Sequence, residues 1–94
     1  MVEFVNELIS FKKIGFKNTN EKPENDPSAV EVYIYTVNDN WKHLKTFELN
    51  FEGKRLETCM CEFINMFRTN ALLFNLTTKS RGDEPIQLQQ IRFF

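Results

Sequence analysis

The sequence predicts an α+β domain: an antiparallel sheet of about five strands with one amphipathic helix packed on one face, in the order β-β-β-α-β-β. Three observations lead to this class. Residues 29–37 and 41–51 show the two-residue period of strands, and residues 54–70 show the spacing of a helix. The length of 94 residues suffices for one hydrophobic core but not for two. We therefore expect residues 1–94 to form a single small domain.

The first strand is expected at residues 9–17, ISFKKIGFK, where Ile14 and Phe16 fit the period of a strand. Residues 1–8 are ambiguous because Phe4, Leu8 and Phe11 fit helical spacing, so this segment is expected either to be helical or to extend the strand. Residues 18–28, NTNEKPENDPS, contain two prolines and no large apolar side chain. This composition predicts a polar loop that we expect to be mobile.

A β-hairpin is expected at residues 29–51. In AVEVYIYTV the apolar side chains alternate between two faces, and in WKHLKTFELNF residues Trp41 to Phe51 of odd number share one face. The intervening NDN is typical of a turn, since Asn and Asp tolerate positive φ. Because residues 29–37 are apolar on both faces and one helix cannot cover five strands, we expect the second face to be covered by the N-terminal residues or by another molecule.

The helix is expected within residues 54–70, KRLETCMCEFINMFRTN. Six apolar side chains recur there at spacings of three and one, which is typical of one helical face: Leu56, Cys59, Met60, Phe63, Ile64 and Phe67. Two further strands are expected at residues 71–79, ALLFNLTTK, and residues 86–94, IQLQQIRFF. In the last strand the apolar parity shifts between Leu88 and Ile91, which indicates a bulge or the loss of a neighbouring strand.

The two thiols, Cys59 and Cys61, are expected to be reduced and to bind no metal. On a helix, residues two apart point to nearly opposite sides, so these cysteines could not easily hold one ion. Cys59 is expected in the core and Cys61 to be partly exposed. His43 is the one histidine, and no residue near it in sequence completes a catalytic set. We therefore expect no catalytic, metal-binding or cofactor-binding residue, and no cofactor.

The charge of the chain is small and evenly spread along the sequence. The net charge is −1, and no half of the chain is strongly basic or acidic, which disfavours a nucleic-acid-binding protein or a nucleic-acid mimic. A mean hydropathy of −0.42 with no long apolar run excludes a membrane-spanning segment. The first residues do not resemble a signal peptide, so a cytoplasmic location is expected and no membrane partner is expected.

A partner-binding surface is expected at Tyr33, Tyr35, Val37 and Trp41, because Tyr and Trp combine apolar area with a polar tip. The chain is therefore predicted to be a non-enzymatic protein-binding module that contacts another protein or, as a dimer, a second copy of itself. A richness in Phe, Ile, Asn and Lys is typical of AT-rich coding DNA, so the more specific prediction is an inhibitor or immunity-type protein encoded by a phage or other mobile element. The alternative is a single-stranded nucleic-acid-binding domain that stacks bases on the same aromatic sheet face.

Overall fold

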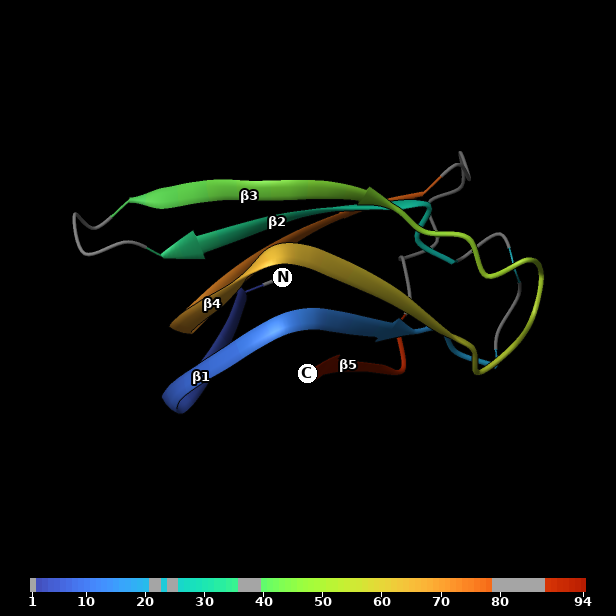
Figure 1. Cartoon of the computed structure of the whole chain (residues 1–94). Coiled ribbons are helices and arrows are strands. Elements are labelled where there is room, and N and C mark those ends of the chain that lie inside the picture. Colours follow the sequence, from blue (N-terminus) through green and yellow to red (C-terminus); the bar gives the residue numbers. More distant parts are fainter. Residues whose placement is uncertain (1, 21–22, 24–25, 36–39, 79–87) are drawn as a thin grey trace.

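The described residues form an all-β domain built from one five-stranded antiparallel sheet (Figure 1). The computed structural model describes residues 2–20, 23, 26–35, 40–78 and 88–94, and for residues 2–7 it describes the backbone alone. The strand order across the sheet is β3-β2-β4-β1-β5. The strands are β1 (Val2–Lys17), β2 (Ala29–Tyr35), β3 (Trp41–Glu48), β4 (Thr58–Thr77) and β5 (Gln90–Phe93).

The prediction of a helix within residues 54–70 is wrong, because residues 58–77 form the long strand β4. The predicted α+β class is wrong as well, because the described residues contain no α-helix. Cys61 and Phe63 are buried, whereas Met60, Glu62 and Ile64 are exposed, so burial follows the two-residue period of a strand. The sequence shows helical spacing because Met60 and Ile64 are apolar although they face solvent, and together with the core residues they fit one face of a helix. The described part of the strand expected at residues 71–79 is the second half of β4, which ends at Thr77, and the strand expected at residues 86–94 is confirmed as the shorter β5. Residues 79 and 86–87 of these predictions lie outside the described part of the chain.

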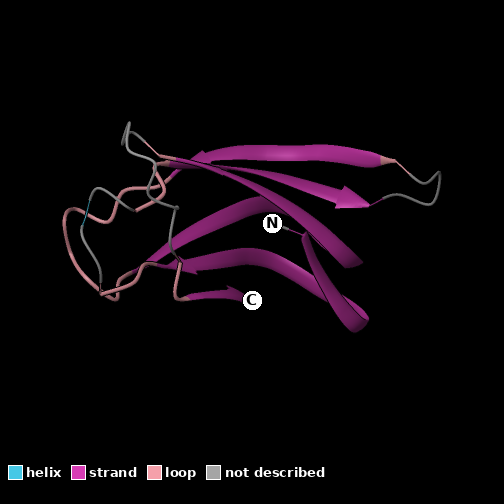
Figure 2. Ribbon diagram, turned by 180° about the vertical axis from the view of Figure 1, so that it is seen from behind, coloured by secondary structure: helices cyan, strands magenta, loops and turns pink. Residues whose placement is uncertain are grey.

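Strands β1 and β4 pair with each other along nearly their whole lengths, and two bulges bend the ribbon that they form. Residues 5–8 of β1 face a single residue of β4, Asn70, and residues 63–66 of β4 face a single residue of β1, Lys12. Extra residues in one strand of an antiparallel pair bend it and increase its twist. Both strands consequently turn back at one end of the molecule, as Figure 2 shows from behind.

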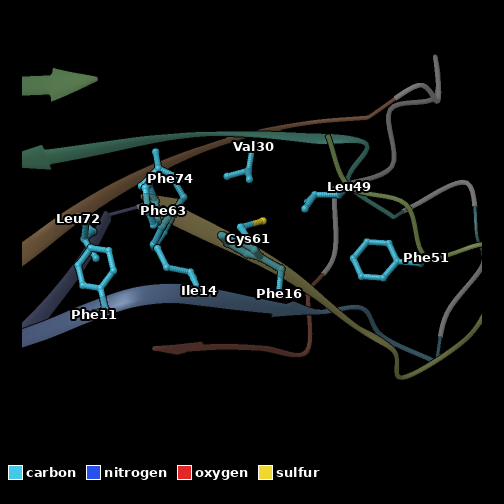
Figure 3. Packing of buried hydrophobic residues seen from close by; sticks show 11 residues of the cluster. Phe11, Ile14, Phe16, Val30, Leu49, Phe51, Cys61, Phe63, Leu72 and Phe74 are labelled. Atoms are coloured by element: carbon cyan, nitrogen blue, oxygen red, sulfur yellow. The ribbon is translucent and has the colours of Figure 1, made fainter. Parts of the chain in front are cut away.

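This bend divides the sheet into two layers. The first layer contains β3, β2, the second half of β4 and the start of β1; the second contains the first half of β4, the second half of β1, and β5. The hydrophobic core lies between the two layers (Figure 3). Phe16 of β1 meets Phe74 of β4 with ring centroids 5.5 Å apart, and Phe47 of β3 meets Phe63 of β4 at 5.2 Å. The sheet therefore covers its own inner face, a role that the sequence led us to expect of a helix.

At the end of the molecule opposite the bend, a buried polar group joins two loops. Asn18 is fully buried; its side-chain amide donates to the carbonyl of Lys54 at 2.6 Å, and its side-chain oxygen accepts from the backbone N–H of Glu57 at 2.6 Å. Asp26 forms an ion pair with Arg55. The loop expected at residues 18–28 is thus anchored at both of its described ends, while residues 21–22 and 24–25 lie outside the described part of the chain.

Candidate partner-binding face

The hairpin of β2 and β3 carries two cross-strand aromatic pairs on the outer face of the first layer. Tyr35 lies opposite Trp41 and Tyr33 lies opposite His43. The ring centroids are 5.1 Å apart in the first pair and 5.2 Å apart in the second, and both pairs meet edge to face. Edge-to-face contact is a favoured geometry for aromatic rings, so the two rings of each pair hold each other in place. We call these four residues the aromatic face.

An extra residue in β3 determines which side chains join the aromatic face. The register of β2 with β3 shifts between Val32 and Tyr33, and Leu44 is the additional residue. Trp41 and His43 therefore face outward with the tyrosines, whereas Lys45 lies opposite the buried Val32 and Phe47 packs against the core. The predicted hairpin is confirmed for its described residues, but the single shared face expected for Trp41 to Phe51 is wrong because this bulge reverses the parity.

Glu31 gives the aromatic face a negative charge. Tyr33 donates its hydroxyl to one carboxylate oxygen of Glu31 at 3.0 Å, and the side-chain amide of Asn75 donates to the other at 2.8 Å. The hydrogen bond to Glu31 raises the pKa of Tyr33 above its ordinary value, with partial burial and the negative charge of Glu31 acting in the same direction. The hydroxyl of Tyr33 therefore stays protonated. The carboxylate of Glu31, which Asn75 of β4 holds in place, orients the ring of Tyr33.

The structure brings together three of the four residues that the sequence predicted as a partner-binding surface. Tyr35 is 39% exposed, Trp41 is 36% exposed and Tyr33 is half-buried. Val37 lies outside the described residues. His43 completes the aromatic face and was missed as a partner-binding residue, although the alternation had already placed it beside Trp41; its Nε2 lies 2.9 Å from the hydroxyl of Thr46.

The cysteines lie elsewhere and do not meet the histidine. Both thiols face the core, because residues two apart in a strand point to the same side: Cys61 is buried and Cys59 is half-buried against the core cluster. The partial exposure expected for Cys61 is therefore wrong. His43 is on the outer face of the first layer, so it forms no pair with either thiol. Among the residues that the structure describes, no three His, Cys, Asp or Glu side chains are grouped closely enough to hold a metal ion.

Burial raises the pKa of the Cys61 thiol from its ordinary value to about 12, with a smaller contribution from the neighbouring Cys59 and an opposing one from Lys45. We expect a thiol reagent at mildly alkaline pH to modify Cys59 first and Cys61 only after unfolding, because the thiolate is the reactive form. Labelling at increasing denaturant concentration, read by peptide mass spectrometry, measures this order. Equal rates at both cysteines in the folded protein would contradict the burial of Cys61.

The raised pKa of Cys61 also predicts that the folded protein loses stability at alkaline pH. In the unfolded chain Cys61 ionises near its ordinary pKa of 9.0, whereas in the folded protein its pKa is raised to about 12. Deprotonation therefore favours the unfolded state, and this contribution to the free energy of unfolding decreases as the pH rises through that window. The decrease should be shallower in Cys61→Ala than in the parent, as urea titrations at each pH would show.

No family model, curated protein or solved structure matches this chain. The described part of the chain also contains no helix of the length and apolar character needed to cross a bilayer. The geometry and charge of the two layers are therefore the features that indicate a function.

Proposed function

We propose that this protein is a non-enzymatic protein-binding module that contacts its partner through the aromatic face. The observation that carries the proposal is the edge-to-face pair of Tyr35 and Trp41, each more than a third exposed, on two paired strands of the sheet. Binding surfaces between proteins favour Tyr and Trp because these side chains bury large areas at a small cost in conformational entropy. A small chain that acts by occupying a surface fits an inhibitor or immunity-type protein of a phage or mobile element, acting in a cytoplasm.

Charge favours a protein partner over single-stranded nucleic acid at this face. Glu31 lies within the aromatic face, and the cations of the hairpin belong to the other side of the ribbon, since Lys42 pairs with Ile34 and Lys45 with Val32. Binding of single strands needs cations close to the stacking rings. We expect no change in Trp41 fluorescence when single-stranded oligonucleotides are added at low salt, and salt-sensitive quenching would instead favour the nucleic-acid function.

Tyr35→Glu is expected to abolish partner binding while leaving the fold intact, because it places a charge within the exposed Tyr35–Trp41 pair of the contact surface. The matched control is Leu56→Glu, which adds the same charge at a similarly exposed apolar residue on the loop before β4. Light scattering over a range of concentrations tests self-association, and affinity capture with parent and variants as bait tests a different partner. The aromatic face is not the binding surface if Tyr35→Glu retains whatever the parent binds.

A further inference from the structure

The outer face of the second layer gathers cations that are far apart in the sequence. Exposed or half-buried side chains of β1, β4 and β5 project from it, and we call this set the basic face: Lys12, Lys13, Lys17, Arg68 and Arg92, interspersed with the apolar Leu8, Met60, Ile64, Met66 and Phe94. Among the described side chains of this face, Glu62 is the one carboxylate. The described side chains of the basic face therefore sum to a charge of +4, although the side chains of the whole chain sum to −1.

Strand register shows that the basic face is continuous. Gly15 lies opposite Met60 on β4 and opposite Arg92 on β5. A Cβ atom at Gly15 would lie 3.1 Å from the sulfur of Met60 and 3.3 Å from the ring of Phe94, so these two side chains meet over the glycine. The guanidinium of Arg92 lies 5.6 Å from the centre of the Phe94 ring.

The same continuity extends toward the bend. The backbone N–H groups of Lys12 and Lys13 donate to the carbonyl oxygen of Phe94 at 2.7 and 3.0 Å. Lys13 lies opposite Glu62, and further along the ribbon Ser10 lies opposite Arg68. Cations thus follow the β1–β4 ribbon on one side, because side chains directly opposite in antiparallel strands share a face.

The bulge of β4 adds protruding apolar side chains to the basic face. Ile64 is 87% exposed and Met66 is 67% exposed, and both belong to the bulged residues 63–66 that face Lys12. Side chains of this size and exposure contribute nothing to the core. Exposed apolar groups surrounded by charge mark a contact surface.

We propose that the basic face binds the surface of an anionic lipid bilayer, with the lysines and arginines over the headgroups and Ile64 and Met66 inserted at the boundary with the acyl chains. Interfacial binding requires both elements, apolar insertion and attraction to anionic lipid. A nucleic-acid backbone would use the cations but offers no apolar region for Ile64 and Met66. The exposed pair of Tyr35 and Trp41 lies on the other layer, and among the described side chains of the basic face Phe94 is the one exposed aromatic ring. This binding is peripheral, and it goes beyond contact with a protein at the aromatic face.

Cosedimentation with phosphatidylcholine vesicles, with and without phosphatidylglycerol, tests the proposal. The parent is expected to bind the anionic vesicles only, and less at high salt. The double variant Lys12→Ser/Lys13→Ser is expected to lower the partition coefficient roughly 30-fold, and Ile64→Ser/Met66→Ser roughly tenfold. The control Lys42→Ser/Lys54→Ser removes the same charge outside the basic face and is expected to bind nearly as well as the parent.

Three results would overturn the proposal: no binding to either vesicle, equal binding to neutral and anionic vesicles, or equal weakening by both lysine pairs. Binding of single-stranded oligonucleotides that is lost in Lys12→Ser/Lys13→Ser but unchanged in Ile64→Ser/Met66→Ser would assign the face to nucleic acid instead. Tyr35→Glu is the cross-check, because it should leave vesicle binding unchanged. Circular dichroism confirms that each variant is folded, which the exposure of the substituted residues leads us to expect.

Discussion

Phe63→Ala is expected to lower the free energy of unfolding by about 3–5 kcal/mol, whereas Ile64→Ala, one residue further, should change it by less than about 0.5 kcal/mol. Phe63 is buried and its ring packs against Phe11, Phe47 and Phe67 at centroid distances of 5.7, 5.2 and 5.4 Å. Removing the ring leaves a cavity between the two layers that the paired strands cannot easily close. Ile64 contributes almost no burial, so its truncation removes little.

Urea unfolding of the two variants and the parent measures the contrast. It also separates the strand from a helix over the same residues, because in a helix both side chains would lie on the buried stripe and both substitutions would be costly. A large loss of stability in Ile64→Ala would contradict the structure of β4. A small loss in Phe63→Ala would contradict the packing between the two layers.

The sequence predicts most of the strands but not the long one, for a reason visible in these two residues. Alternation identified residues 29–37 and 41–51 because apolar and aromatic side chains recur in each run at a period of two and the turn-forming NDN separates the two runs. In β4 the solvent side carries Met60, Ile64 and Met66, so the pattern on the core side is hidden by apolar side chains on the other. The positions of the apolar residues alone then fit the spacing of a helix better than that of a strand, although burial follows the pairing of β4 with its neighbouring strands.

The two surfaces differ in how far they could be predicted. Tyr33, Tyr35 and Trp41 were identifiable because the sequence NDN predicts that the two neighbouring runs pair, and β2 does pair with β3. The bulge at Leu44 that orients Trp41 leaves no mark in the sequence. The basic face could not be predicted. Its cations span residues 12–92, and the even distribution of charge along the chain concealed that folding places them on one side. A net charge near zero therefore says little about the charge of a single face.

Asn18→Ala is expected to lower the free energy of unfolding by about 2–3 kcal/mol, because the side chain is fully buried and joins two loops through hydrogen bonds. Its amide serves both the carbonyl of Lys54 and, at 3.3 Å, a carboxylate oxygen of Asp26, and its oxygen accepts from Glu57. Alanine would leave these groups without that partner. Chemical unfolding measures the loss, and Asn20→Ala, at an exposed asparagine of the same loop, is the matched control.

The variant Asn18→Asp tests the role of the amide N–H donor separately from the size of the side chain. Aspartate keeps an oxygen for the N–H of Glu57, but its carboxylate cannot donate to Lys54 and places a second negative charge beside Asp26. We therefore expect Asn18→Asp to be at least as destabilising as Asn18→Ala at neutral pH, despite its nearly identical size. If Asn18→Asp is as stable as the parent, the amide donor is not what joins the loops. Stability would then depend on the ion pair of Asp26 with Arg55, which an Arg55→Met variant would show by a loss of comparable size.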